Sequence, residues 1–572
     1  MKNSDLEDWG RRAAEWSVAY LASLDTQPVR PPTRPGEVRA SLPESPPTEA
    51  ESVEDIFSDF QSLVVPHVTN WQHPRFFAYF PSNSSPPSIL AEWLTATMAA
   101  QCMLWQTSPA GTEMEIHVLD WLRQMTGIGE GWHGVIQTGA GMATLSAILT
   151  AREKALDWTG KEQGLAGQKV LRVYSSTQAH SSIEKAVFLS GIGRDNLVKI
   201  PFDAEGAMQA DALRDAIAAD RAAGYLPCAV CCVVGGTSVG VSDRLDEILP
   251  IARDEGLFSH VDAAWAGTAM ICPEFRDMIR GVEMADSLVM NPHKWMMTNF
   301  DCSAHFVKSP DGLKKTMSIT PAYLVTQDAE GITDFSQVTM ELGRRFRALK
   351  LWFVIRAYGV SGLQEIIRNH VTWAGELADR IAATPGFELT SPARLGLFSF
   401  RLRPQGMEDG ADLDRLNARF LDAVNADGTI YLTQTVHDDR YVIRVSIGAT
   451  ATRAEDMDIA LERIIAIAKP FLVEKGLIDF WSIEENFDRL KRGDYGKLNM
   501  LYTYKVILGY SNEFSDYLLK IAADFANKNK LNKDQFLYEC SEVLKFQNCK
   551  VLNFNDNMTY NHEIYEDFKF DF

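Results

Sequence analysis

The segment Met290-Asn291-Pro292-His293-Lys294-Trp295 places a lysine among apolar residues, directly after the short apolar stretch 287–289. Burial disfavours the charged form of a lysine and lowers its pKa, so such a lysine suits chemistry better than solubility. A desolvated amine is also the group that forms Schiff bases with aldehydes. We therefore expect Lys294 to act as a nucleophile.

A second apolar stretch, upstream, ends in His260-Val261-Asp262-Ala263-Ala264-Trp265. Asp262, at the end of this expected strand, supplies the anion that a protonated pyridine nitrogen needs. Lys294 and Asp262 together predict a site for pyridoxal 5'-phosphate (PLP), and we expect no metal centre in it.

The composition is that of a globular protein, with 46% hydrophobic and 23% charged residues among 572. A net charge of −20 and the lack of a basic block argue against a nucleic-acid partner. The acidic segment 1–8 lacks the apolar core of a signal peptide, and no apolar run approaches the ~18 residues that span a bilayer. We expect a cytoplasmic protein without a membrane partner.

Three of the eight cysteines, Cys228, Cys231 and Cys232, lie inside an apolar stretch. Their C-x-x-C-C spacing is compatible with half of a zinc site, but no second cysteine or histidine pair stands nearby. We expect buried thiols in a reducing compartment rather than a disulfide framework.

From about residue 80 to 300, helical patterns alternate with short apolar strands, expected at 134–137, 170–174, 229–234, 260–262 and 287–290. This alternation predicts an α/β domain with a largely parallel sheet, which binds ligands beyond the carboxyl ends of its strands. Polar residues follow these strand ends repeatedly: Thr138, His180, Thr237, Asp262 and Lys294.

The flanking regions predict other modules. Residues 5–24 have the pattern of an amphipathic helix, and the proline-rich stretch 29–36 favours an extended arm. Trp9 and Trp16 on that helix would dock on another subunit or pack within the chain. A helix at 364–383, strands at 387–389, 396–402 and 441–446, and a helix at 454–472 predict a smaller α+β domain over 365–475.

The composition changes abruptly after Lys475. The last 97 residues hold 8 of the 16 tyrosines, and lysine replaces arginine as the main basic residue. This shift predicts a separately acquired module or a fusion over 476–572, partly helical at 498–525, to which no function is assigned.

The segment Gln137-Thr138-Gly139-Ala140-Gly141-Met142 follows a strand and opens a helix. Small residues there let backbone N–H groups approach a phosphate, although glycine at such a turn also serves packing alone. His180, in Ala179-His180-Ser181-Ser182, precedes another expected helix, where a lone histidine is commonly structural.

Taken together, these motifs resemble the group II PLP-dependent decarboxylases, and within them the aromatic-L-amino-acid decarboxylase branch that includes tryptophan and tyrosine decarboxylases. The resemblance runs in order over about residues 5–475 and is carried by segments 134–145, 178–186, 260–267, 291–295 and 343–350. It implies the aspartate-aminotransferase-like fold of PLP fold type I. The expected division is a dimerisation arm over 1–80, a PLP-binding domain over 81–364, the small domain over 365–475 and the extension.

The resemblance also implies residue roles. Lys294 would hold PLP covalently, Asp262 would pair with the ring nitrogen, and His180 and Ala264 would cover the two ring faces. Thr237 would lie near His180 and the substrate carboxylate. The phosphate would be held by a further set: Ala140, Gly141, Asn291 and His293. Relatives usually have serine where this chain has Gly141, which removes a hydroxyl donor that Thr138 could replace.

The aromatic side-chain pocket would comprise Trp71, Tyr79, Phe80, Pro81, Met103 and Gly343. Segment 318–331 resembles the mobile active-site loop, with Tyr323 as proton donor, although a surface tyrosine is the alternative. Relatives with phenylalanine at this position tend to form aldehydes, so Tyr323 favours an amine product.

We interpret the chain as a decarboxylase of an aromatic L-amino acid. Gly343 resembles the glycine of indole-preferring relatives, which makes tryptophan the first choice, while phenylalanine, tyrosine and DOPA stay open. There are two alternatives: an aromatic aldehyde synthase of the same family, or a scaffold or binding protein that acts through the C-terminal extension. The family's architecture implies a homodimer with active sites at the interface.

Overall fold

The computed structural model describes residues 3–319 and 333–473. The chain divides at Lys475 into two compact units, and the described residues belong to the first. The predicted loop residue Tyr323, most of the loop 318–331, and the C-terminal extension with its helix at 498–525 lie outside the described residues.

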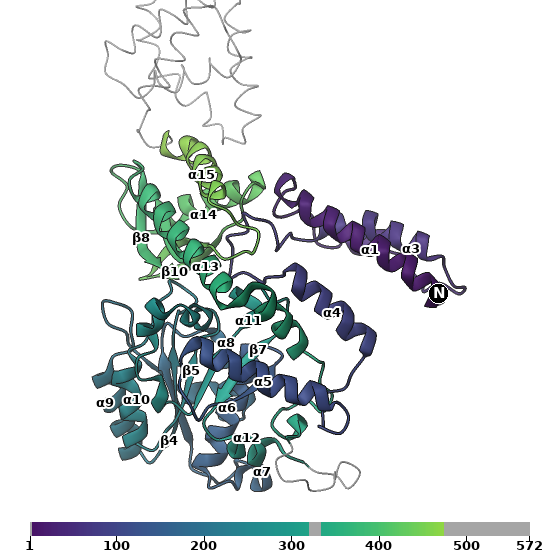
Figure 1. The fold of residues 1–572 in the computed structure, drawn as a ribbon. Coiled ribbons are helices and arrows are strands. Elements are labelled where there is room, and N and C mark those ends of the chain that lie inside the picture. Colours follow the sequence, from purple (N-terminus) through teal and green to yellow (C-terminus); the bar gives the residue numbers. More distant parts are fainter. Residues whose placement is uncertain (1–2, 320–332, 474–572) are drawn as a thin grey trace, which may run out of the picture. The chain divides into compact units, whose positions relative to one another are not determined.

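A seven-stranded sheet forms the centre of the larger domain (Figure 1), in the order β1-β7-β6-β5-β4-β2-β3. β7 runs opposite to its neighbours β1 and β6, and the other strands are parallel. The strands are β1 (His133–Gln137), β2 (Leu171–Ser176), β3 (Leu197–Ile200), β4 (Leu226–Val233), β5 (Phe258–Asp262), β6 (Ser287–Met290) and β7 (Ser303–Val307). The predicted fold class, with a mostly parallel sheet, is therefore confirmed.

Helices cover both faces of this sheet. They are α5 (Pro109–Thr126), α6 (Ala140–Ala155), α7 (Gly160–Gln163), α8 (Ser181–Leu189), α9 (Ala210–Ala222), α10 (Leu245–Asp254), α11 (Pro292–Trp295) and α12 (Pro310–Met317). In β4, Cys231 packs in one core cluster with residues of α6 and α8, while Cys232 packs in another with residues of α9 and α10. A strand buried on both faces is apolar throughout, which explains why β4 shows no alternation.

The three cysteines of β4 are all buried side chains of these cores. Cys231 and Cys232 are neighbours in a strand and point to opposite faces of the sheet. Packing of these side chains in the cores on both faces of β4 therefore accounts for the C-x-x-C-C spacing.

The smaller domain has a four-stranded antiparallel sheet in the order β10-β11-β9-β8. Its elements are β8 (Phe387–Arg394), β9 (Leu397–Leu402), α14 (Ala411–Asp427), β10 (Thr433–His437), β11 (Arg440–Ser446) and α15 (Glu455–Val473). The long helix α13 (Ala348–Ala382) contributes to the cores of both domains and changes direction at Gly359, whose φ is +66°. Only glycine adopts this left-handed conformation without strain.

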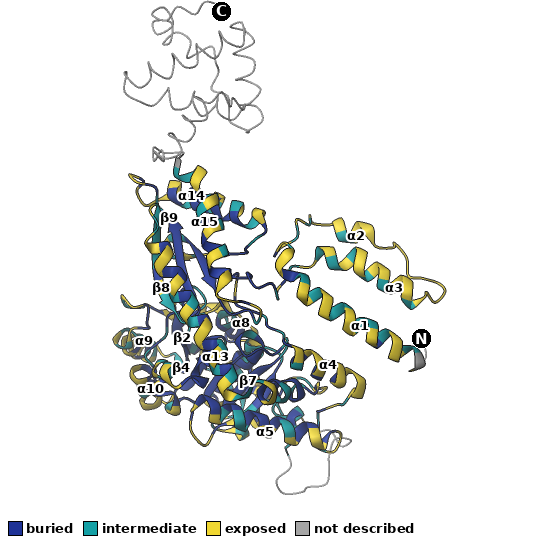
Figure 2. Ribbon diagram, turned by 45° about the horizontal axis from the view of Figure 1, so that its top comes forward, coloured by how far each residue is buried: buried dark blue, intermediate teal, exposed yellow. Residues whose placement is uncertain are grey.

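The N-terminal part comprises α1 (Asn3–Ser23), α2 (Glu37–Ser41), α3 (Val53–Asp59) and α4 (Pro86–Met98). The Trp9 ring lies 5.7 Å from Phe57 and the Trp16 ring lies 4.9 Å from Phe60. Packing within the chain therefore covers part of both indoles. Figure 2 nevertheless shows α1, α2 and α3 lined with exposed residues, unlike the buried strands of the large sheet.

Candidate active site

A cavity of about 230 Å³ lies where the parallel strands of the large sheet end. It is lined by residues that follow β1, β2, β4, β5 and β6, which come from distant parts of the sequence. The predicted site residues that line it are Phe80, Ala140, Gly141, His180, Thr237, Asp262, Ala264, Asn291, His293 and Lys294. This is the edge at which open α/β sheets bind ligands.

Lys294 lies in α11, the single helical turn that follows β6. Burial lowers the pKa of its amine, the nearby Asp262 carboxylate raises it, and the Arg444 guanidinium lowers it again. Asp262 ends β5, is 7% exposed, and accepts a hydrogen bond from the Ala264 backbone N–H at 3.0 Å. The site therefore pairs an amine poised to lose its proton with a fixed carboxylate.

Phe80 packs against this amine. Its ring centroid lies 5.1 Å from Lys294 Nζ, 5.3 Å from the Arg444 guanidinium carbon and 4.6 Å from the Trp265 ring, which stacks on it. These rings give the cavity an apolar aromatic wall beside its reactive groups. Ionic interactions are strengthened where such a wall excludes water.

Arg444, on β11, is a buried cation whose hydrogen bonds go to uncharged acceptors. It donates to Ser238 O at 2.9 Å and to Thr433 Oγ1 at 3.1 Å. Burial lowers the pKa of Arg444 to about 10. The positive charge of Arg444 lowers the pKa of Lys294.

His180 is the N-cap residue of α8. Its Nδ1 accepts a hydrogen bond from the Ser182 backbone N–H at 3.1 Å and lies 2.8 Å from Ser182 Oγ. Burial lowers the pKa of His180, Asp262 raises it and Lys294 lowers it. With Nδ1 accepting, the neutral ring carries its proton on Nε2.

The N-terminus of α6 offers a place for a phosphate. The cap residue is Gly139, without a side-chain cap, and a Cβ at Gly139 or Gly141 would meet no atom within 4 Å. The first N–H groups of a helix have no partner within it and attract anions. Open space above free donors suits the phosphate of PLP.

Two residues from the turn after β6 line the same cavity. His293 Nδ1 accepts the Cys302 N–H at 3.0 Å, and burial lowers the pKa of His293 to about 4, so its neutral ring donates through Nε2. Asn291 Oδ1 accepts the Ser303 hydroxyl at 2.6 Å, which leaves its amide N–H groups as donors. Both side chains thus present donors suited to an anion, and the set fits PLP.

Several predicted residues lie elsewhere. Thr138 does not line the cavity, and its hydroxyl lies 3.5 Å from Glu341 Oε1. Trp71 and Tyr79 stack on each other at 5.8 Å outside the cavity, and Pro81 lies against Gly448. Met103 accepts a hydrogen bond from Ser336 through its carbonyl, and Gly343 neighbours Gln101.

Sequence reasoning missed other residues that line the cavity: Gly139, Ser182, Val233, Gly235, Gly236, Trp265 and Phe300. Trp265 and Ser182 sit beside predicted residues, so their motifs held a usable signal. Phe300 is 66% exposed, contacts the His293 ring at 4.8 Å, and lies in a loop without a periodic pattern. That Phe300 lines the cavity is visible only in the folded structure.

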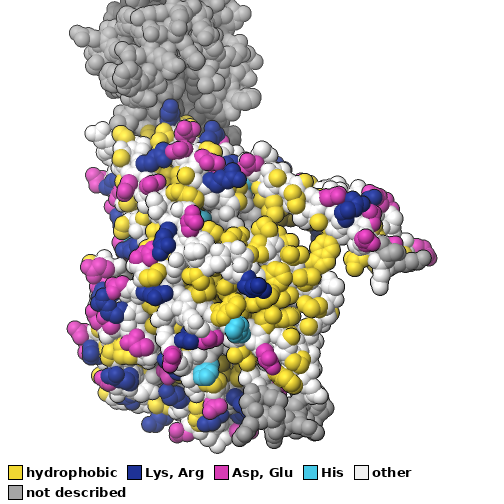
Figure 3. Space-filling view, in the orientation of Figure 1, with side chains coloured by type: hydrophobic (Ala, Val, Ile, Leu, Met, Phe, Trp, Pro, Cys, Tyr) yellow, Lys and Arg dark blue, Asp and Glu magenta, His cyan; other side chains and the backbone are white. Residues whose placement is uncertain are grey.

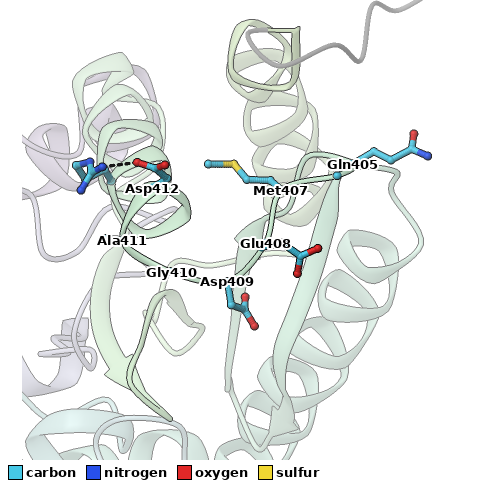
Figure 4. A pocket seen from close by; sticks show the side chains of 9 residues that line it. Gln405, Met407, Glu408, Asp409, Gly410, Ala411 and Asp412 are labelled. Carbon is cyan, nitrogen blue, oxygen red and sulfur yellow. Dashed lines mark hydrogen bonds and ion pairs between the residues drawn. The ribbon is translucent and has the colours of Figure 1, made fainter.

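Figure 4 shows a second cavity, of about 470 Å³, in the loop between β9 and α14. It is lined by residues 405–412 and Arg415. Two of its three acidic side chains form ion pairs, Asp412 with Arg415 and Asp409 with Arg401 and Arg403. These contacts explain the loop's structure and indicate no chemistry.

Within residues 3–319 and 333–473, no helix is both long and apolar enough to cross a bilayer. The same part of the chain contains no group of three His, Cys, Asp or Glu residues placed to hold a metal ion.

Comparison with known proteins gives consistent matches. Residues 35–403 match the model of the pyridoxal-dependent decarboxylase conserved domain. Aromatic-L-amino-acid decarboxylase of Mus musculus is 39% identical over 487 residues, covering 82% of this chain and 99% of the relative. Phenylacetaldehyde synthase of Arabidopsis thaliana is 37% identical, covering 83% and 98%.

Among solved structures, that of Oryza sativa TDC with PLP and tryptamine superposes with a TM-score of 0.80 at 34% identity, covering 82% of this chain and 99% of that one. The fold, the PLP-compatible cavity and these matches agree. The chain belongs to the pyridoxal-dependent decarboxylases and, within them, to the aromatic-L-amino-acid decarboxylase family, with PLP as its cofactor.

Proposed function

We propose that the chain decarboxylates an aromatic L-amino acid to the corresponding arylalkylamine and CO2, with tryptophan as the first choice of substrate. Phenylalanine, tyrosine and DOPA are the other candidates. The observation that carries this proposal is the cavity in which the Lys294 amine, the Asp262 carboxylate and the His180 ring meet at the strand ends.

In this proposal each residue of the cavity has a different chemical role. Lys294, whose pKa is lowered by burial, would supply the amine that attaches PLP covalently. Bound PLP supplies an electron sink for the pair released when CO2 departs. Asp262 would hold a negative charge beside the ring nitrogen, and His180 and Ala264 would cover the two faces of the ring.

Substrate binding would use the apolar wall formed by Phe80 and Trp265. A substrate carboxylate held against such groups loses hydration, which favours its departure as CO2. The rice structure with tryptamine supports an indole substrate, as does the resemblance of Gly343 to the glycine of indole-preferring relatives. Tyr323, as proton donor, would complete the amine product.

We also propose a homodimer, with each active site completed by residues of the other subunit. Figure 3 shows hydrophobic side chains gathered over α4 and beside the N-terminal helices. Large apolar residues exposed on α4 are Ile89, Leu90, Trp93, Leu94 and Met98. A contiguous exposed apolar face marks an interaction surface. A partner would also explain why Met103 and Gly343 lie outside the cavity of a single chain.

The proposed location is the cytoplasm. The six cysteines of residues 3–319 and 333–473 are all buried and unpaired, as in a reducing compartment.

An aldehyde synthase is the second candidate, because one relative at 37% identity carries that name. It would consume O2 and water and release the aldehyde, CO2, ammonia and hydrogen peroxide, whereas the proposed reaction releases only the amine and CO2. Product analysis separates the two.

The test is a panel of tryptophan, phenylalanine, tyrosine and DOPA given to the PLP-loaded enzyme, with amine, CO2, aldehyde and peroxide measured together. We expect one mole of amine per mole of CO2 and the highest kcat/KM for tryptophan. Aldehyde and peroxide in place of amine would establish the second candidate, and turnover of none of the four would refute the aromatic substrate.

A further inference from the structure

Asn83 lies in the segment that joins the aromatic stretch 76–81 to α4, and it is 2% exposed. Its amide Nδ2 donates to the carbonyl of Lys294 at 2.7 Å and to the carbonyl of Gly448 at 2.8 Å. Its Oδ1 accepts from the backbone N–H of Thr450 at 2.8 Å and from the Thr450 hydroxyl at 2.9 Å. Every donor and acceptor of the amide is therefore used.

The backbone of Asn83 is fixed in the same place. Its N–H donates to the carbonyl of His293 at 3.1 Å. Gln72 holds the two neighbouring residues, because its amide donates to Ser82 O at 2.6 Å and accepts from Ser84 N at 2.9 Å. The amide can adopt only one orientation, since carbonyls only accept hydrogen bonds and the Thr450 N–H only donates.

These hydrogen bonds join the larger and the smaller domain beside Lys294. His293 and Lys294 belong to α11 of the larger domain, whereas Gly448 and Thr450 follow β11 of the smaller one. α11 has only four residues, so little intrahelical hydrogen bonding holds it in place. Asn83 is a bridge that fixes the α11 backbone from outside.

We infer that Asn83 is a positioning residue, which holds the Lys294 backbone against segment 448–450 and thereby aims the Lys294 amine at Asp262. This inference rests on the proposed role of Lys294. Asn83 does not line the cavity. Its loss should therefore disturb the chemical step more than substrate binding, because a misplacement of about 1 Å can cost on the order of 100-fold in rate.

The test uses Asn83→Ala, which removes all the amide bonds, and Asn83→Asp, which keeps the shape but turns a carboxylate oxygen toward two carbonyls. In the PLP-loaded enzyme we expect kcat to fall at least about 10-fold while KM changes less than about 3-fold. The pH midpoint of the absorbance band of the lysine-bound cofactor should also shift.

Asn417 provides a matched control. It is a fully buried asparagine whose amide bonds Leu402 and Leu413 within the smaller domain. Asn417→Ala should lower the unfolding temperature as Asn83→Ala does, yet leave kcat and the absorbance midpoint unchanged. If both Asn83 variants lose stability but keep kcat and the midpoint, the inference is wrong.

Thr450→Val keeps the test decisive if the Asn83 variants do not fold. It removes the hydroxyl, which contacts Asn83 Oδ1 and Met297 Sδ, and leaves the backbone N–H bond to Oδ1 in place. We expect a fall in kcat of about 2-fold to 3-fold, with the midpoint shifted; no change in either quantity would refute the bridge. Borohydride trapping of wild-type enzyme distinguishes a failure of the Asn83 inference from a failure of the proposed function. A label on Lys294 with unaffected variants refutes only the role of Asn83, whereas no label on Lys294 refutes the proposed function.

Discussion

The amine of Lys294 lies 5.1 Å from the centre of the Phe80 ring, and the guanidinium of Arg444 lies 5.3 Å from the same ring. One aromatic side chain therefore contacts two basic groups of the site, the Lys294 amine and the Arg444 guanidinium. Arg444 lowers the pKa of Lys294, while Asp262 raises it. The pKa of Lys294 thus depends on residues of both domains.

Arg444→Gln removes one of the influences that lower the pKa of Lys294, so the pKa of the amine should rise. The pH dependence of Lys294 acylation in PLP-free enzyme, followed by peptide mapping, measures this. Arg444→Lys keeps a positive charge and should move the midpoint less. A midpoint that falls or stays unchanged in Arg444→Gln would show that Arg444 does not act on Lys294.

Gly141→Ser restores a hydroxyl at the N-terminus of α6, where a Cβ meets no atom within 4 Å. A hydrogen bond to a charged group contributes about 1.5–3 kcal/mol, so the Kd for PLP should fall about 10-fold or more. Titration of PLP-free enzyme by tryptophan fluorescence measures it. Gly141→Ala is the control without a hydroxyl, and equal affinities of the two variants would contradict the phosphate site.

Tyr323→Phe removes the proposed proton donor. Amine yield should fall, and aldehyde and hydrogen peroxide should rise, because an unprotonated product carbon is left open to oxygen. Chromatography of the products with a peroxide assay checks this. Unchanged amine output would remove Tyr323 from the reaction.

The stability of the fold should decrease between pH 6.5 and 4. Burial lowers the pKa of His370 from 6.5 to about 4, so on acidification the unfolded chain takes up a proton before the folded chain does. This one group weakens the folded state by roughly 3 kcal/mol across that window and has no effect above it.

Urea unfolding at a series of pH values tests this window. His370→Gln cannot titrate and should show a shallower loss of stability there, although it also weakens the 3.0 Å hydrogen bond from the Trp295 indole. His117→Gln, at an exposed position, should keep the wild-type slope. Equal slopes for His370→Gln and wild type would contradict the prediction.

Sequence patterns predicted five strands of the large sheet, and they worked best for the wholly apolar β4. β5, which contains Ser259 and His260, was recognised only over 260–262. The patterns missed β3, a short strand with the charged Lys199, and β7, which contains Ser303 and His305. His305 is buried and reaches the Ser287 hydroxyl at 2.8 Å. A polar residue paired inside the core gives no hydrophobic signal before the chain folds.

The site shows the same limit. The place of Lys294, Asp262 and His180 in the cavity could be predicted, because each lies at or shortly after the end of a strand and the strand ends of a parallel sheet converge. Arg444 and Asn83 lie far from those motifs in sequence, and only tertiary packing brings them to α11. Phe300 likewise carries no pattern that marks it.

We propose that the Lys294 amine binds PLP covalently. Borohydride reduction of the PLP-loaded enzyme, followed by digestion and mass spectrometry, identifies the residue that carries the cofactor. We expect a single pyridoxyl label on the peptide that contains Lys294, and its loss in Lys294→Ala. A label on another lysine, or no label, would refute this role of Lys294.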